Sequence, residues 1–203
     1  NQSLCVFKDR YNYVHIVNLN NKTDSYYNTT GNFELRYSVP AIGDVDNDGN
    51  PEAVFWFNKD NNNGYGVLVF DLESKKPDPF FNQNGYVDNL FSPAIFVGGV
   101  ENFENFALKG HPVLADINND GKMEIAVTAT YDDSINVNFN LDWATQIFIF
   151  NSSGSQLVSY CTGHILCNDG FSVINRWHGS NPFVMDYNKD GINELCAVID
   201  NKT

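Results

Sequence analysis

β-Branched residues alternate with other, mostly apolar residues over short stretches of this chain, and this two-residue period is its clearest structural signal. Three such stretches each end in Asp or Asn: YVHIVN at 13–18, GVLVFD at 66–71 and QIFIFN at 146–151. Alternation rich in β-branched and aromatic residues predicts β-strands. No stretch keeps the 3.6-residue period of an amphipathic helix, so we expect very little helix.

A nine-residue acidic sequence occurs three times at regular intervals: DVDNDGNPE at 44–52, DINNDGKME at 116–124 and DYNKDGINE at 186–194. A proline lies four positions before each copy, at Pro40, Pro112 and Pro182. An apolar run follows each copy: AVFWF at 53–57, IAVTAT at 125–130 and LCAVI at 195–199. The repeating unit therefore reads as strand, acidic loop, strand, turn and alternating strand.

The repeat divides the chain into one region of three units, at about 32–104, 105–175 and 176–203, the last continued by 1–31. A unit of this size with about four short strands is typical of a propeller blade. The predicted fold is therefore all-β, with propeller-like blades of about four antiparallel strands. A solenoid and a sandwich are the alternatives. We assign LESKKPDP at 72–79 to a turn inside the first unit.

The end of the chain reads into its beginning with the strand spacing preserved. If residue 203 is joined to residue 1, the number of residues from Glu194 to Tyr13 equals the number from Glu124 to Gln146. Two interpretations follow: the terminal strands complete one blade within the chain, or they complete it between neighbouring copies. Three units fall below the range of about four to eight blades in closed propellers. This favours joining between copies or a larger parent chain, and we expect a processed or excised segment.

Charge narrows the range of partners. The 203 residues carry a formal charge of −13, from 25 acidic and 12 basic residues. Nucleic acids are bound through Lys and Arg, so this balance argues against them and favours cations or a basic partner. No apolar run approaches the ~20 residues that a membrane-spanning helix needs.

The first acidic loop has the composition of a cation site. Asp44, Asp46 and Asp48 stand at positions 1, 3 and 5, where side chains of a tight turn converge. Gly49 allows the sharp bend, and Asn50 offers a backbone carbonyl. Such hard oxygen ligands suit Ca²⁺. Carboxylates about 4 Å apart repel by ~1 kcal/mol in water and ~4 kcal/mol at an effective dielectric constant of 20. A solvated Asx turn is the alternative for one loop, and threefold recurrence favours the cation.

The acid that closes each loop stands at position 9, at Glu52, Glu124 and Glu194, and strands flank the loop. An EF-hand instead places this acid at position 12 between helices. The pattern resembles the FG-GAP/VCBS repeats, best known from integrin α-subunit propellers, and covers all three units. The resemblance implies a β-propeller whose inter-strand loops each hold one Ca²⁺.

By position, the resemblance implies three ligand sets. They are Asp44, Asp46, Asp48, the Asn50 carbonyl and Glu52; Asp116, Asn118, Asp120, the Lys122 carbonyl and Glu124; and Asp186, Asn188, Asp190, the Ile192 carbonyl and Glu194. Asn replaces Asp at position 3 of the second and third loops, which removes one charge from each. We therefore expect these two loops to bind Ca²⁺ more weakly than the first.

Cysteines and glycosylation sequences predict a secreted or cell-surface glycoprotein. Five Asn-x-Ser/Thr acceptors occur, at Asn1, Asn21, Asn28, Asn151 and Asn201. Cys161 and Cys167 are close enough in sequence to form a disulfide. Cys5 and Cys196 lie in strands that would be neighbours in the joined unit, so we expect a second disulfide there. Two buried thiols are the alternative.

Motifs of catalysis are missing: no G-x-S-x-G, no phosphate-binding Gly-rich loop and no H-E-x-x-H occurs. We therefore expect a non-catalytic extracellular calcium-binding module with a structural or adhesive role. Its partners would be a protein or glycan ligand, or further copies that assemble into an array or fibre. The alternatives are a lectin propeller that uses Trp143 and Trp177, and an ancillary domain of a larger secreted enzyme.

Overall fold

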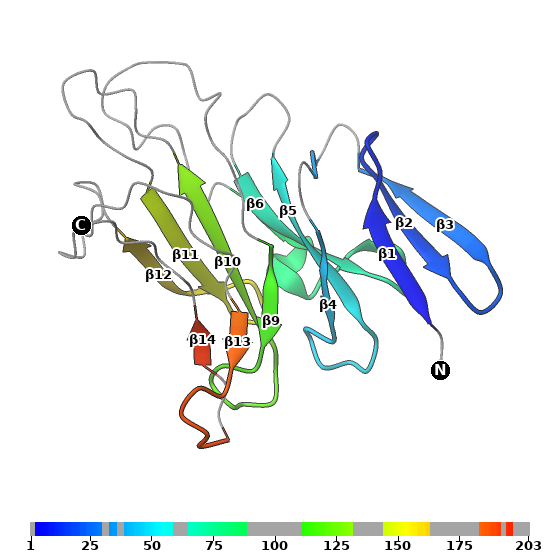
Figure 1. Ribbon diagram of the computed structural model, residues 1–203. Helices are drawn as coiled ribbons and strands as arrows, with labels where there is room; N and C mark the ends of the chain where they lie inside the picture. The colour runs from blue at the N-terminus through cyan, green and yellow to red at the C-terminus, as the bar shows by residue number, and fades with distance from the viewer. Residues whose placement is uncertain are drawn as a thin grey trace, which may run out of the picture.

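The structure is a computed structural model. It describes residues 3–29, 33–35, 39–58, 65–88, 111–131, 144–162, 183–191 and 194–196. Within these segments the chain forms four antiparallel sheets that follow one another in sequence (Figure 1). The predicted all-β class is confirmed, and the described residues contain just one helical element, the 3-10 helix η2 (Phe81–Gln83).

Each sheet is an antiparallel meander. Sheet A is β1 (Leu4–Lys8), β2 (Tyr13–Asn18) and β3 (Thr23–Asn28). Sheet B is β4 (Ala41–Gly43), β5 (Glu52–Asn58), β6 (Tyr65–Asp71), β7 (Lys76–Pro77) and β8 (Tyr86–Val87). Sheet C is β9 (Val113–Ala115), β10 (Glu124–Tyr131), β11 (Ala144–Phe150) and β12 (Gln156–Thr162). Sheet D is β13 (Phe183–Met185) and β14 (Glu194–Cys196).

The strands on either side of each acidic loop form where the repeat predicts them. Each loop joins two antiparallel strands in the same register, because the residue before the first Asp pairs with the position-9 Glu. These pairs are Gly43 with Glu52, Ala115 with Glu124 and Met185 with Glu194. The three alternating stretches form β2, β6 and β11. The three units are therefore repeated in structure as well as in amino-acid sequence.

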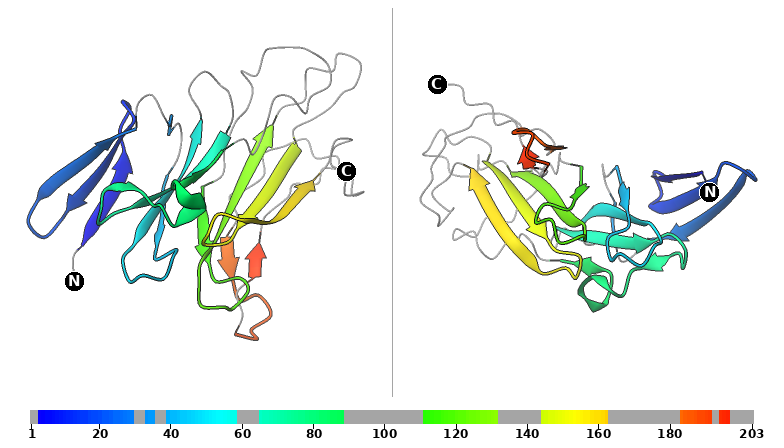
Figure 2. Two further views of the ribbon diagram at one scale, coloured as in Figure 1. Left: turned by 180° about the vertical axis from the view of Figure 1, so that it is seen from behind. Right: turned by 90° about the horizontal axis from the view of Figure 1, so that it is seen from below.

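Sheet B lies between sheets A and C and is buried on both faces. Ala53, Phe55 and Phe57 pack with Val14 and Ile16 of sheet A, while alternate residues of the same strands pack towards sheet C. Seen from below, the three sheets follow one another in a curved row (Figure 2). Burial of both faces explains why β5 reads as an unbroken apolar run instead of an alternating one.

The short strands before the acidic loops lie side by side. β9 lies between β4 and β13, and the three loops project from the same end of the molecule (Figure 1). Gly43 approaches β9 closely, since a Cβ built on it would lie 3.0 Å from Leu114 Cδ1. This arrangement brings the three acidic loops to one end of the stack of sheets.

The fourth strand of sheet B is interrupted. β7 pairs with β6 at Phe70 and Asp71, whereas β8 pairs with it at Val67 and Leu68, and residues 78–85 leave the sheet between them. Within this excursion the Asn82 amide donates to the Ser153 carbonyl at 2.9 Å, in the turn between β11 and β12 of sheet C. The assignment of 72–79 wholly to a turn is therefore wrong, since β7 lies inside it.

The two ends of the chain do not form one sheet among the described strands. β1 pairs with β2, whereas β13 and β14 pair with each other and lie beside β9 (Figure 1). The predicted disulfide between Cys5 and Cys196 is not formed within the chain, because the exposed thiol of Cys5 is unbridged. Joining between copies stays a prediction.

Several predicted features lie outside the described residues. These are Asn1, Trp143, Cys167, Trp177, Ile192 and Asn201. The Cys161–Cys167 disulfide therefore stays a prediction. In the described part of the chain, no helix has the length and apolar character needed to cross a membrane. No closed ring of sheets is formed by these segments either, so the propeller is taken up again below as a proposal.

Candidate metal centre

The three acidic loops have the same hydrogen-bonded geometry. In each, the backbone amide of position 5 donates to Oδ1 of the first Asp, at 3.0 Å in all three loops. The same amide donates to the side chain at position 3, at 3.1, 2.9 and 2.8 Å. The glycine amide at position 6 donates to Oδ2 of the first Asp, at 3.0, 2.9 and 3.0 Å. Three sequences that differ in detail therefore form one turn.

Two residues of each loop adopt a left-handed backbone conformation, which explains the Asn and Gly in the pattern. Position 4 has φ of 63° at Asn47, 59° at Asn119 and 64° at Lys189. Position 6 has φ of 94°, 87° and 89° at the three glycines. A residue without Cβ adopts this region without strain, and Asn tolerates it better than most residues. The glycine therefore sets the curvature that turns positions 1, 3 and 5 inward.

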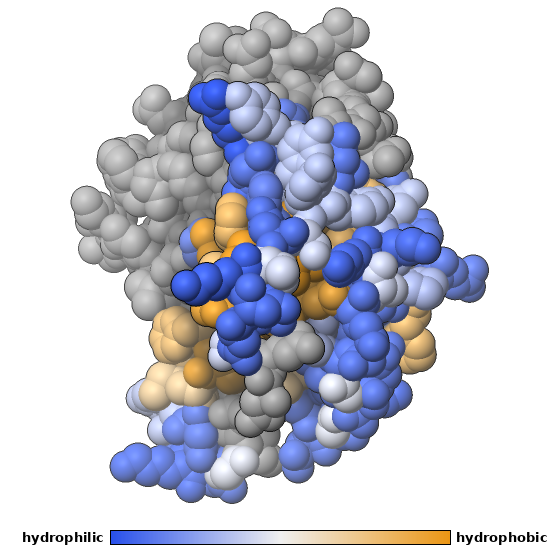
Figure 3. All heavy atoms as spheres, turned by 90° about the vertical axis from the view of Figure 1, so that its right-hand side faces the viewer, coloured by the Kyte–Doolittle hydropathy of each residue, from blue (hydrophilic) through white to orange (hydrophobic). Residues whose placement is uncertain are grey.

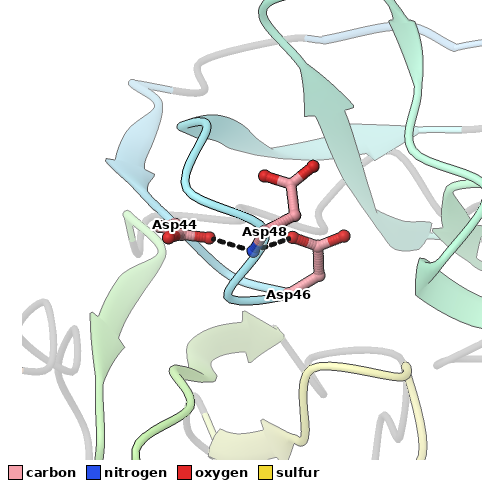
Figure 4. Close-up of side chains that lie close together, drawn as sticks. All are labelled: Asp44, Asp46 and Asp48. Atoms are coloured by element: carbon pink, nitrogen blue, oxygen red, sulfur yellow. Dashed lines mark hydrogen bonds between the residues drawn. The ribbon is translucent and has the colours of Figure 1, made fainter.

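The first loop brings three carboxylates together. One oxygen from each of Asp44, Asp46 and Asp48 lies within 4.8 Å of the others, so this triad could hold a metal ion. Figure 4 shows the three side chains gathered around the Asp48 amide. Ca²⁺ binds oxygens at about 2.3–2.6 Å, so ligands on opposite sides of the ion lie about 5 Å apart. The spacing of the triad fits that requirement.

The glutamate at position 9 clamps the loop from inside. Glu52 is 2% exposed, and its Oε2 accepts a hydrogen bond from the Val45 amide at 2.6 Å. Glu124 is 1% exposed, and its Oε2 accepts one from the Ile117 amide at 2.8 Å. The triad of the first loop does not include Glu52. In these two loops the carboxylate at position 9 therefore accepts a hydrogen bond from the backbone amide at position 2. Coordination of a metal ion by position 9 stays a prediction.

Burial and like charges perturb the acids of the first loop. Burial, opposed by the Val45 hydrogen bond and reinforced by the charges of Asp46 and Asp78, raises the pKa of Glu52 to about 8. Burial also raises the pKa of Asp46, with Asp48 and Asp44 adding to the effect. Both shifts mean that the folded loop resists holding all its negative charges at once. A bound cation would remove that resistance.

The second loop partly satisfies its own acids through an amide. Asn118 stands at position 3, and its Nδ2 donates to Asp120 Oδ2 at 3.2 Å and to Glu124 Oε1 at 3.0 Å. In the third loop, Asn188 Nδ2 donates to Asp190 Oδ2 at 3.0 Å. Asp46 has oxygens at both positions and offers no such donor. The charge difference predicted from the sequence is therefore also a difference in hydrogen bonding.

Position 7 is held in place by position 5. The Asn50 amide donates to Asp48 Oδ1 at 2.7 Å, and the Lys122 amide donates to Asp120 Oδ1 at 2.9 Å. The predicted contribution of their carbonyls to a cation site remains a prediction, as does the role of Glu194.

Two acids outside the loop accompany the first site, and sequence reasoning missed both. Asp71 ends β6, where it pairs with Glu52 across β5 and β6. Asp78 begins the excursion from sheet B, is 5% exposed and adds to the charge felt by Glu52. The stretch KKPDP is typical of an exposed turn, so no pattern in it signals a buried carboxylate.

The predicted glycosylation sites that can be placed lie at the surface or partly so. Asn21 and Asn28 are exposed, and Asn151 is half-buried. Oδ1 of Asn151 accepts hydrogen bonds from the Ser155 amide at 2.8 Å and from Ser153 Oγ at 2.9 Å. Glycosylation of all five acceptors stays a prediction.

Comparison with known proteins provides no relative: no protein-family model, no curated protein and no solved structure matches the chain. The functional argument therefore depends on the loops themselves.

Proposed function

We propose that this chain is a non-catalytic, extracellular calcium-binding β-repeat module whose three acidic loops each bind one Ca²⁺. The observation that carries the proposal is the recurrence of one turn geometry, with the first Asp and position 3 turned inward, in three loops of different sequence. In the first loop this geometry also brings the carboxylates of Asp44, Asp46 and Asp48 within 4.8 Å of one another, a grouping of like charges that a bound cation would stabilise.

The role of the ions is structural. Each loop connects the two strands that open a unit, and all three loops lie at one end of the stacked sheets. Ions there would neutralise the loops and hold the short strands β4, β9 and β13 together. Three Ca²⁺ would change the formal charge from −13 to about −7. Calcium sites in extracellular modules have Kd values of about 10⁻⁴–10⁻³ M, which suits the calcium concentration outside cells.

The stacking of the sheets supports the FG-GAP/VCBS-like propeller as the architecture of this module. Meandering sheets that pack face to face, with their first strands side by side, have the arrangement of successive propeller blades. In such a module the loops stabilise the blades, and adhesion would use the remaining surface. Copies that join end to end would extend the same stack into an array or fibre.

Calorimetric titration with Ca²⁺, after removal of divalent ions with a chelator, tests the proposal. We expect binding heat with about three ions per chain and a higher melting temperature in millimolar Ca²⁺ than in chelator. A chain with Asp44→Asn, Asp116→Asn and Asp186→Asn is the matched control, since it changes only the first residue of each loop. Absence of heat together with an unchanged melting temperature in the unmodified chain would refute the proposal.

A glycan-binding role is the second candidate, because aromatic rings lie on the outer face of sheet A. The rings of Phe7 and His15 stack with centroids 4.9 Å apart, and Tyr26 lies beside His15 with centroids 6.0 Å apart. Phe7 and Tyr26 are 40% and 68% exposed. Figure 3 shows that hydrophilic residues cover most of this end of the molecule, with smaller apolar areas among them. Aromatic faces framed by polar groups are suited to stacking on sugars.

A glycan array separates the two roles. Binding that is lost in Tyr26→Ala but kept in Tyr11→Ala, an exposed tyrosine elsewhere in sheet A's connections, would favour the lectin. Binding that is lost in Trp177→Ala instead would place the sugar site outside sheet A.

A further inference from the structure

Asp78 is a buried acid with half of its carboxylate unsatisfied. Its side chain is 5% exposed, and its Oδ1 accepts a hydrogen bond from the Phe80 amide at 2.9 Å. Its Oδ2 is buried and has no hydrogen-bond partner. A buried polar atom without a partner costs about 1–3 kcal/mol, and more when the group is charged. An oxygen in this position therefore points to a partner that completes the site.

The charged side chains that act most strongly on Asp78 are acidic. Asp46, Asp71 and Asp48 raise its pKa in addition to burial, and no basic side chain contributes to lowering it. Asp78 also acts on Glu52 of the loop. Val45 of the loop and Phe81, three residues after Asp78, belong to one apolar cluster. The excursion of sheet B therefore packs against the first acidic loop, and Asp78 belongs to the acidic surroundings of its triad.

The second unit lacks this arrangement, which makes it a natural comparison. Asn151 directly follows β11, whereas Asp71 is the last residue of β6. β12 then pairs with β11 as one strand from Gln156 to Thr162, without an excursion like that of residues 78–85. Both side chains accept hydrogen bonds from their own turns, Asp71 Oδ1 from the Glu73 amide and Asn151 Oδ1 from the Ser155 amide. The difference between the two units at this position is therefore the charge of Asp71. In the described parts of the first two units, such extra acids accompany the first loop, which has Asp at position 3, and not the second.

We propose that Asp78 is an outer ligand of the first calcium site, whose buried Oδ2 accepts a hydrogen bond from a water molecule bound to the ion that Asp44, Asp46 and Asp48 hold. This inference rests on the proposed function. Ca²⁺ takes about six to eight oxygens, so three side chains and a carbonyl leave positions for water. The water would bind the ion through its oxygen and donate a hydrogen bond to Asp78 Oδ2. The ion would thereby gain a ligand and the buried oxygen a hydrogen-bond partner.

An outer carboxylate of this kind strengthens binding by orienting and polarising the coordinated water. Outer partners of metal ligands are worth about 10- to 100-fold in metal affinity. The same carboxylate is unfavourable without the ion, because it is then a buried charge facing other acids. Asp78 should therefore weaken the calcium-free chain and strengthen the calcium-bound one.

The experiment is calorimetric titration of the full chain with Ca²⁺, together with melting temperatures in chelator and in Ca²⁺. Loss of the tightest binding step in Asp44→Asn assigns that step to the first loop. Asp78→Asn should weaken this step about tenfold or more, leave the weaker steps unchanged and raise the melting temperature in chelator. Glu73→Gln removes one exposed negative charge from the turn between β6 and β7 and should change none of these values.

The outcomes distinguish this inference from the function on which it rests. An unchanged tightest step in Asp78→Asn would overturn the inference while leaving the calcium loops intact. The same would follow if Asp78→Asn lowered the melting temperature equally with and without Ca²⁺, since a purely structural acid behaves in that way. Absence of any binding step in the unmodified chain would overturn the proposed function and this inference together. Asp78→Ser, whose hydroxyl can still accept from the Phe80 amide, replaces Asp78→Asn if the latter does not fold.

Discussion

Position 3 distinguishes the first acidic loop from the other two, since it is Asp46 in the first loop and Asn in the second and third. Asp46 contributes a second oxygen to a crowded group of carboxylates, whereas Asn118 turns an amide nitrogen towards Asp120 and Glu124. The amide relieves the repulsion of its neighbours without an ion. We therefore expect lower affinity for a cation where this position already holds a donor.

Exchange of these residues should exchange the affinities. Asp46→Asn is expected to weaken the tightest calcium-binding step, because it replaces a negative charge by a hydrogen-bond donor. Asn118→Asp makes the opposite change and is expected to raise the calcium affinity of the second loop. Charge–charge interaction at about 4 Å is worth ~1–4 kcal/mol near a protein surface, so shifts of about tenfold are expected. Titration calorimetry on the two single variants measures them. Equal affinities in all three chains would contradict the role given to position 3.

Glu52 should make the calcium-free chain sensitive to pH. Its pKa in the folded chain is about 8, against an ordinary value of 4.5, so the folded state binds an extra proton between these values. Stability of the folded chain in chelator therefore falls as the pH rises from about 4.5 to about 8. A pKa unit corresponds to about 1.4 kcal/mol, so the loss is on the order of a few kcal/mol. Melting temperatures between pH 5 and 8.5 in chelator measure it.

A matched pair of variants isolates the contribution of Glu52 to this pH dependence. Glu52→Gln cannot ionise and should flatten the decline, whereas the exposed Glu73→Gln should leave it unchanged. Saturating Ca²⁺ should also flatten it, because the ion stabilises the ionised acids of the loop. A decline of the same slope in Glu52→Gln would show that another group causes it.

At the scale of elements, the sequence predicts the hairpins that hold the loops because two independent signals coincide there. The prolines and apolar runs mark strands, and Gly at position 6 marks a left-handed turn, so β4, β9 and β13 with their partners form as expected. The excursion at 78–85 could not be predicted, because a buried Asp78 depends on contacts with a distant loop and not on its neighbours in sequence. The pairing of β1 with β2 was not predicted, since spacing across the chain ends does not decide which strands pair.

Burial of sheet B on both faces makes a prediction about neighbouring residues of one strand. Phe55 and Trp56 are 0% and 1% exposed and face sheets A and C respectively. Each should cost about 3–5 kcal/mol of unfolding free energy when changed to Ala. Phe7→Ala on the outer face of sheet A, where the ring is 40% exposed, should cost much less. Denaturant unfolding of the three variants checks this; a small loss in either Phe55→Ala or Trp56→Ala would mean that one face of sheet B is not packed in solution.

At the scale of the whole molecule, the stack gathers negative charge at one end. The chain has 25 acidic and 12 basic residues, and the three acidic loops project from the same end of the sheets (Figure 1). Repulsion between the loops therefore adds to repulsion within each loop. Because the loops follow strands that lie side by side, we expect a cation bound in one loop to make the electrostatic potential at the next loop less negative.

This gathering of charge predicts that salt partly replaces calcium. In chelator, an increase of NaCl from about 20 mM to 500 mM should raise the melting temperature, because the Debye length falls from about 20 Å to about 4 Å and screens the loops from one another. With Ca²⁺ bound, the formal charge falls in magnitude from −13 to about −7, so the same increase in salt should have a smaller effect. The triple variant Asp44→Asn, Asp116→Asn and Asp186→Asn should show the smaller salt effect even in chelator, since it has lost three of the charges. Equal salt effects in chelator and in Ca²⁺ would mean that the loops do not carry the repulsion, and that the ions act only through local geometry.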